Sequence, residues 1–136
     1  MIAIVDAGPL YAAVDADDDD HQRCLAVLGR RDLDLVVPAL VIAEVTYLVG
    51  RRLGASIEAA FLRGLGTLEV ESPTPEDWLA ISDVVARYAD FPLGGADASV
   101  AVLADRLGTD LIVTLDRRHF GAIKSSLGEP YQLLPE

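Results

Sequence analysis

Short apolar runs alternate along this chain with longer segments in which apolar and polar residues mix. The apolar runs have the length of buried strands, and they predict strands at residues 1–5, 34–37, 67–70, 111–114 and 131–134. The longer segments carry proline near their beginnings or glycine after their ends, as helices often do. They predict helices that begin near residue 9 and at 21–28, 39–52, 56–65, 75–90 and 96–107, with a short helix before the last strand.

Strands and helices that alternate through the whole length predict an α/β fold. Because a crossover between parallel strands is almost always right-handed and carries a helix, we expect a mainly parallel central sheet with helices on both faces. A chain of 136 residues has the size of one domain, and neither a repeat nor a linker interrupts residues 1–136. The sequence therefore predicts a single α/β domain.

The composition narrows the class of protein. Apolar residues make up 51% of the chain, as in ordinary globular proteins, and the longest uncharged apolar stretch, residues 35–43, is too short to span a bilayer. The first residues carry no basic leader, so we expect a cytoplasmic protein that does not enter membranes. Cys24 is the only cysteine, which excludes an internal disulfide and predicts a buried, reduced thiol.

Four acidic residues lie in segments that are otherwise built for the core. Asp6, Glu44 and Asp97 are each the only charged residue within a stretch of at least 14 residues, and Asp116 directly follows the apolar run 111–115. Removing a carboxylate from water costs several kcal/mol unless a partner compensates the charge. Arginine is absent from these segments, whereas one hard divalent cation compensates several carboxylates together through oxygen ligands. The pattern therefore predicts a metal site.

The expected topology agrees with this prediction. Asp6 and Asp116 each follow a predicted strand, and ligands of open parallel sheets bind beyond the carboxyl ends of the strands. Asp97 falls in the first turn of its helix, where the helix dipole favours an anion, and Glu44 falls near the middle of another helix. We predict that Asp6, Asp97 and Asp116, with Glu44, hold Mg²⁺ or Mn²⁺ and form a catalytic centre.

Other polar residues near these acids have both a functional and a structural interpretation. Thr114 could hydrogen-bond Asp116 or a metal-bound water, or it could be only a good strand former. Ser99 could support the site, or it could satisfy backbone groups in the first turn of its helix. His119 is expected to pack beside Phe120 rather than to contact phosphate.

The charge balance bears on any nucleic-acid substrate. A formal net charge of −11 argues against tight, sequence-independent binding, because such binding needs a basic surface. Ten of the eleven basic residues are arginines, whose planar guanidinium suits bidentate phosphate binding. The pairs nearest the predicted site in sequence are candidate phosphate contacts of a nucleic acid: Arg51, Arg52, Arg117 and Arg118.

Three further features have structural interpretations. Trp78 and Tyr88 are at helical spacing with other apolar residues, so we expect core packing rather than base stacking. One aspartate of the acidic run 17–20 is expected to cap the helix at 21–28. His21 is expected at the solvated start of that helix.

The chain resembles the PIN-domain nucleases and, within them, the VapC toxins of prokaryotic toxin–antitoxin pairs. Four segments carry the resemblance: Ile4-Val5-Asp6-Ala7-Gly8-Pro9-Leu10, Val41-Ile42-Ala43-Glu44-Val45, Gly95-Ala96-Asp97-Ala98-Ser99 and Val113-Thr114-Leu115-Asp116-Arg117-Arg118-His119-Phe120. The resemblance implies an α/β/α sandwich, and it places the four acids at the four acidic positions of the family site. Gly8 is a departure, because many relatives carry serine or threonine there.

The resemblance also implies an activity and partners. We expect the toxin of a type II toxin–antitoxin system, an endoribonuclease that uses Mg²⁺ or Mn²⁺ and is inhibited by a VapB-type antitoxin. A homodimer and larger toxin–antitoxin assemblies are implied as well. Because the chain is acidic and has few candidate phosphate contacts, we expect it to recognise the shape of structured RNA, such as loops of tRNA or ribosomal RNA, and so to inhibit translation.

Three other interpretations are open on the residues alone. A metal-free ribonuclease could use His21 and His119 as acid and base, and chelation would leave it active. A receiver-type signalling domain gathers acids and magnesium at strand ends, but it needs a lysine after a late strand, and the only lysine is Lys124. A PIN fold without catalysis would be a binding module.

Overall fold

Five short strands form one sheet in the order β3-β2-β1-β4-β5, and every neighbouring pair is parallel. The structure, a computed structural model, describes residues 1–136. The strands are β1 (Ile2–Val5), β2 (Asp34–Pro38), β3 (Glu69–Glu71), β4 (Leu111–Val113) and β5 (Gln132–Leu134). The predicted mainly parallel sheet is therefore confirmed, and the sheet is entirely parallel.

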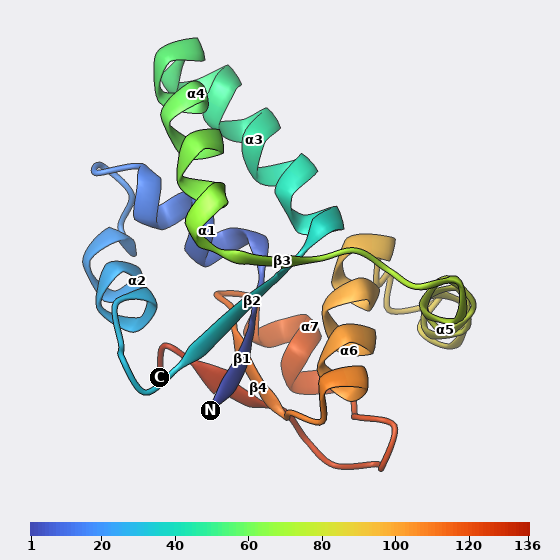
Figure 1. Ribbon diagram of the computed structural model, residues 1–136. Helices are drawn as coiled ribbons and strands as arrows, with labels where there is room; N and C mark the ends of the chain where they lie inside the picture. The colour runs from blue at the N-terminus through green and yellow to red at the C-terminus, as the bar shows by residue number, and fades with distance from the viewer.

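Seven α-helices flank the sheet (Figure 1). They are α1 (Ala7–Val14), α2 (His21–Leu28), α3 (Ala39–Leu53), α4 (Ala55–Gly64), α5 (Pro75–Arg87), α6 (Gly95–Leu107) and α7 (Arg117–Ala122). In Figure 1, α3 and α4 form a hairpin that rises away from the sheet, while α2 lies on one side of the strands and α5 and α6 on the other. None of the helices is both long enough and apolar enough to cross a bilayer.

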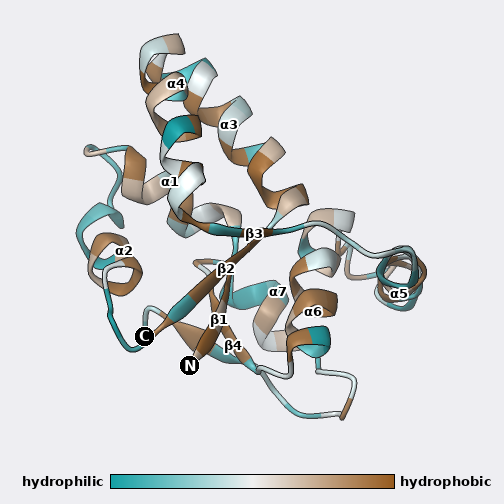
Figure 2. Cartoon of the chain, in the orientation of Figure 1, coloured by the Kyte–Doolittle hydropathy of each residue, from teal (hydrophilic) through white to brown (hydrophobic).

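The core is centred on the three middle strands, which are largely apolar (Figure 2). Ile4, Val5, Val37, Ile112 and Val113 have no exposed surface. Both faces of these strands are covered by helices, so their sequences read as continuous apolar runs. Apolar burial of this kind is the dominant favourable contribution to folding.

The edge strand β3 is short and polar, and the sequence pattern located it less accurately than the central strands. The prediction placed a strand at 67–70, whereas Thr67 belongs to a 3₁₀ turn, Leu65–Thr67, and β3 begins at Glu69. The Thr67 hydroxyl donates a hydrogen bond of 2.8 Å to the carbonyl of Gly64. An edge strand is exposed along one side, so its sequence carries little of the apolar signal that marks a central strand.

Local capping residues fix several helix ends. Thr74 and Asp77 form a reciprocal capping box at the start of α5, and Gly108 closes α6 in the left-handed region with φ of 70°. The prediction that an aspartate of the run 17–20 caps α2 was correct in the position but wrong in the hydrogen bond. Asp20 occupies the N-cap position of α2, but its carboxylate makes no capping bond and instead accepts a hydrogen bond of 2.7 Å from Arg23.

The structure also corrects the prediction for Trp78, whose surface is 51% exposed. Helix α5 lies on the outside of α6 and buries only a narrow stripe, in which Ile81 is the most buried apolar residue. Trp78 lies outside this stripe. The prediction was wrong because helical spacing alone does not indicate how wide the buried face of a helix is. Tyr88 does pack against the core, and Cys24 is buried as expected.

Candidate active site

The four predicted acids line one open depression of about 500 Å³, although they come from distant parts of the chain. Asp6 directly follows β1, and Asp116 lies just beyond β4. Asp97 is in the first turn of α6, and Glu44 is near the middle of α3. Because β1 and β4 are adjacent and parallel, their carboxyl ends form one edge. The strand order also reverses here, since later strands are added on either side of β1, and such switch points are the ligand sites of open α/β sheets.

Backbone hydrogen bonds hold the first of these acids in place. The Asp6 N–H donates a bond of 2.9 Å to the carbonyl of Val113, which extends the contact between β1 and β4 by one residue. Asp6 is the N-cap residue of α1, yet its carboxylate makes no capping bond. Its oxygens are therefore not used to stabilise the helix start, as those of an ordinary capping aspartate would be.

Thr114 joins two of the acids through one buried hydroxyl. Its Oγ1 donates a hydrogen bond of 2.8 Å to Oδ2 of Asp6 and accepts one of 2.9 Å from the backbone N–H of Asp116. The Thr114 side chain is completely buried. The hydrogen bond between Thr114 and Asp116 that the sequence suggested is present at the backbone N–H of Asp116, and the carboxylate that Thr114 contacts is that of Asp6.

Burial and neighbouring carboxylates raise the pKa values of Asp6, Glu44 and Asp97. Burial raises the pKa of Asp6 to about 6, and the charges of Asp97 and Asp116 add to this increase while the Thr114 hydrogen bond opposes it. Partial removal from water and the charge of Asp6 raise the pKa of Glu44. Removal from water and Asp116 raise the pKa of Asp97, which His119 lowers. Such mutual repulsion is expected where carboxylates share a site without a compensating cation.

His119 is a member of this group that the sequence analysis did not place there. Its Nδ1 lies 2.6 Å from Oδ2 of Asp116, whose Oδ1 accepts a bond of 2.9 Å from the backbone N–H of His119. Its ring packs edge-on against Phe91, with ring centroids 4.9 Å apart. The sequence did contain a signal for this contact, because His119 follows Asp116 by three positions. A residue three positions after a helix N-cap faces back toward that cap.

The donor set of the depression fits a divalent cation. Carboxylate oxygens are the ligands that hard cations such as Mg²⁺ and Mn²⁺ prefer, and several acids are present. Neither lysine nor arginine lines the depression, so no side chain there offsets the negative charge. A bound cation would remove the repulsion that raises the carboxylate pKa values.

The candidate RNA-binding arginines lie outside the lining of the depression. Arg52 lies over the ring of Tyr11 at 5.1 Å, and Arg118 lies 6.0 Å from the centre of the Phe91 ring. Arg117 donates a hydrogen bond to the carbonyl of Pro135. Arg51 is exposed. None of the four arginine side chains therefore lines the depression.

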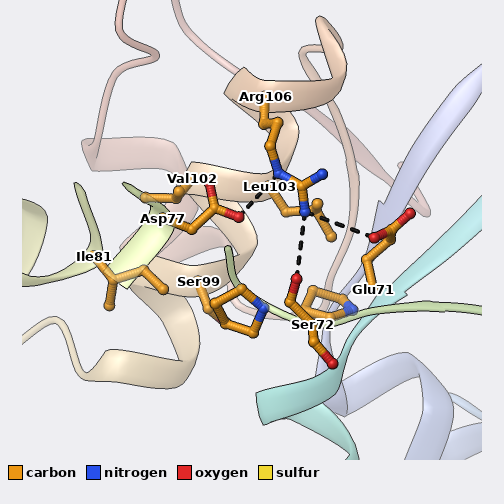
Figure 3. A pocket seen from close by; sticks show the side chains of 10 residues that line it. Glu71, Ser72, Asp77, Ile81, Ser99, Val102, Leu103 and Arg106 are labelled. Carbon is orange, nitrogen blue, oxygen red and sulfur yellow. Dashed lines mark hydrogen bonds and ion pairs between the residues drawn. The ribbon is translucent and has the colours of Figure 1, made fainter. Parts of the chain in front are cut away.

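Ser99 lies in a different cavity from the acids, shown in Figure 3. Its hydroxyl donates a hydrogen bond of 2.6 Å to the carbonyl of Ala96, which is the structural role considered from the sequence. Arg106 also lines this cavity, and it binds Asp77 at 2.9 Å and lies 3.7 Å from Glu71. These ion pairs connect α6 to α5 and β3.

Lys124 also lies away from the acids. It lines a cavity between α5, α6 and the segment after α7, together with Tyr88 and Tyr131. A receiver-type domain needs a lysine beside its acidic residues, and the depression has none. The arrangement therefore does not support the signalling alternative.

The resemblance to known proteins extends over nearly the whole chain. Residues 3–124 match the family model described as the PIN domain. The chain is 37% identical over 134 residues to Ribonuclease VapC26 of Mycobacterium tuberculosis. The alignment covers 97% of this chain and 99% of that protein.

Solved structures share the fold. VapC20 of Mycobacterium tuberculosis, described as a toxin that cleaves the sarcin-ricin loop, superposes with a TM-score of 0.74 at 19% identity over 82% of this chain and 87% of that chain. VapBC2 of Rickettsia felis, bound to a DNA fragment from its promoter, has a TM-score of 0.72 at 18% identity over 98% of both chains. Because the PIN-domain model matches most of the chain and a VapC ribonuclease is 37% identical over nearly all of it, the chain belongs to the PIN-domain family and, within it, to the VapC endoribonucleases.

Proposed function

We propose that this chain is the toxin of a type II toxin–antitoxin system, and that it hydrolyses phosphodiester bonds of structured RNA with Mg²⁺ or Mn²⁺. The observation that supports this proposal most directly is the depression lined by Asp6, Glu44, Asp97 and Asp116, which neither lysine nor arginine lines. Four carboxylates without a cation are a poor surface for RNA, whereas the same carboxylates with a divalent ion form a phosphate-binding site.

In this proposal some of the residues bind the ion and others position water or another side chain. Asp6, Asp97 and Asp116 hold the principal ion, which supplies charge for the phosphate and lowers the pKa of water when it is bound. Glu44 accepts a hydrogen bond from the attacking water, or it binds a second ion. Thr114 keeps the Asp6 carboxylate fixed through the bond between its hydroxyl and Oδ2. The products would carry 5′-phosphate and 3′-hydroxyl ends.

The substrate class follows from charge and fold. A chain of net charge −11 cannot depend on general attraction to phosphate, so it selects RNA by shape, and exposed loops of tRNA or ribosomal RNA are the expected targets. A protein of the same fold, VapC20, is described as cleaving the sarcin-ricin loop. Cleavage of such loops in the cytoplasm would stop translation.

The proposed partners are a VapB-type antitoxin and a second copy of the chain. Proteins of the same fold have been solved as VapBC complexes from Rickettsia felis and Salmonella typhimurium, both with DNA. We infer that this chain forms a homodimer that joins its antitoxin in a larger assembly. The antitoxin would keep the depression inactive until it is removed.

RNA end mapping after treatment with the purified protein tests the proposed function. We expect new 5′-phosphate ends in tRNA or ribosomal RNA with Mg²⁺ or Mn²⁺, and none after chelation or with Asp6→Asn. Asp19→Asn is the matched control, because Asp19 is exposed and lies in the loop before α2, outside the depression. Cleavage that survives chelation would favour the histidine mechanism, and wild-type protein that binds antitoxin without cutting RNA would favour a binding module.

A further inference from the structure

His119 lies where a metal held by the acids could use its imidazole. Ligand atoms of Asp97, Asp116 and His119 all fall within 4.8 Å of one another. Two of these residues come from the segment around α7, and Asp97 comes from α6. The three side chains are each partly buried. This convergence includes a nitrogen donor that the four acidic positions do not supply.

The contacts of His119 go beyond those of an ordinary surface ion pair. A pair with Asp116 alone would need only the hydrogen bond of 2.6 Å at Nδ1. The imidazole also stands within ligand distance of Asp97 on another helix, and Phe91 supports the ring from its edge. Only 23% of the His119 side chain is exposed, so the ring has little freedom to turn into solvent.

We propose that His119 provides a nitrogen ligand to the metal ion held by Asp97 and Asp116, and that the site therefore favours Mn²⁺ over Mg²⁺. The inference rests on the proposed metal site, and it adds to that site a ligand and a metal preference. Imidazole suits transition ions, whereas Mg²⁺ prefers oxygen ligands and keeps its water molecules.

The distances are compatible with one shared ion. Ligands on opposite sides of a small divalent ion are about 4.2 Å apart, since each bond is about 2.1 Å long. The present separations of no more than 4.8 Å therefore require only side-chain movements below about 1 Å. The ligating nitrogen must carry no proton, so the neutral imidazole is the form that binds the ion.

Electron spin-echo spectroscopy of bound Mn²⁺ tests this ligand directly. The probe is Mn²⁺ added to the full chain without a histidine tag, and a histidine ligand gives modulation from its nitrogen. We expect this ¹⁴N modulation in the wild type and its loss in His119→Gln. His21→Gln is the matched control, because His21 is the only other histidine and contacts the carbonyl of Ala12 instead. This variant should keep the signal.

Isotope labelling tests the histidine ligand in the wild-type protein, so the result does not depend on whether His119→Gln folds. Protein grown with ¹⁵N-histidine should show ¹⁵N in place of ¹⁴N modulation with an unchanged sequence. By calorimetry, His119→Gln should weaken Mn²⁺ binding by about tenfold or more and Mg²⁺ binding by less than about threefold. The ratio of the two affinities is the measured quantity.

The outcomes separate this inference from the proposed function. Mn²⁺ binding without any nitrogen modulation, or equal losses for both metals in His119→Gln, would overturn the histidine ligand and leave the nuclease proposal intact. Nitrogen modulation in a protein that does not cut RNA would support the ligand and overturn the nuclease proposal. Absence of any Mn²⁺ binding would overturn both.

Discussion

At the scale of single residues, Asp6 is a carboxylate placed where the fold disfavours its charge. It is 6% exposed, and burial together with the neighbouring acids raises its pKa from 3.8 to about 6. Each unit of such a shift corresponds to about 1.4 kcal/mol between the protonation states. Asp6 in its ionised form therefore opposes folding until a cation compensates it, which is a common feature of reactive centres.

The raised pKa of Asp6 predicts a pH dependence of stability in the absence of metal. The folded-state pKa of Asp6 is raised, so the folded chain binds its proton more tightly between pH 4 and 6, and stability is lost as the pH rises through about 6. We expect the free energy of unfolding to fall by roughly 2 to 3 kcal/mol from pH 4 to pH 7 through this residue. Denaturant unfolding with chelator measures it.

Asp6→Asn is the control for this dependence. The variant should be more stable than the wild type at pH 7 without metal, with a smaller slope against pH, because Glu44 and Asp97 still contribute in the same direction. It should also lose the stabilisation that Mn²⁺ gives the wild type. A metal-free variant that is less stable than the wild type at pH 7 contradicts the argument.

Thr114 gives a second prediction at this scale. Thr114→Val keeps the shape but leaves Oδ2 of Asp6 and the N–H of Asp116 without their present partner, so it should destabilise the fold by about 1–3 kcal/mol. It should also weaken Mn²⁺ binding, measured by calorimetry. Thr114→Ser restores the hydroxyl and should restore most of the metal affinity. Equal affinities in the two variants would exclude the positioning role.

At the scale of elements, a polar contact joins α5 to α6 beside the apolar stripe that packs against the core. Its buried stripe is narrow, and Trp78 and Leu79 remain exposed. Asp77 accepts hydrogen bonds from the N–H of Thr74 and from Arg106, so one carboxylate both starts the helix and joins it to α6 (Figure 3). This contact supports the helix that carries Asp97.

Asp77→Ala should therefore destabilise the fold by about 2–4 kcal/mol, because it removes a cap and leaves Arg106 without its shortest ion pair. Urea unfolding followed by circular dichroism measures this change. Asp83→Ala is the matched control, since Asp83 is exposed on the same helix and should change stability by less than about 0.5 kcal/mol. Similar losses in both variants would show that helix propensity, not the Arg106 contact, is responsible.

At the scale of the whole molecule, charge and topology act separately. The parallel sheet brings chain segments that are far apart to one edge, and it does so whatever the surface charge is. The net charge of −11 decides instead how RNA approaches, because it provides no general attraction. Binding must then depend on a few local contacts.

The salt dependence of RNA binding tests this view. With about two phosphate contacts, affinity for single-stranded loops should fall only about tenfold between 50 and 200 mM salt, against a thousandfold or more for proteins with six to ten contacts. Fluorescence anisotropy with a labelled RNA hairpin, Asp6→Asn protein and Mn²⁺ measures it without cleavage. A steep dependence would indicate a basic surface that the net charge conceals.

The sequence alone predicted the parts of the structure that depend on local burial. Apolar runs located the central strands, and isolated acids identified Asp6, Glu44, Asp97 and Asp116 as residues that lie together. Both signals are local, because a segment that will be buried must be apolar along its length, and a charge within it is conspicuous. The bounds of the edge strand β3 and the exposure of Trp78 were predicted wrongly, because partly exposed segments have only a weak hydrophobic pattern.

Tertiary structure decided which groups actually meet. The bond between Thr114 and Asp6 joins residues 108 positions apart, and it exists because β1 and β4 are adjacent in the sheet. His119 faces Asp116 and Asp97 because α7 begins at the same edge as α6. Hydrophobic patterning determines which residues are buried, but strand order and side-chain orientation determine their partners, so the chemistry of the site was completed only by the fold.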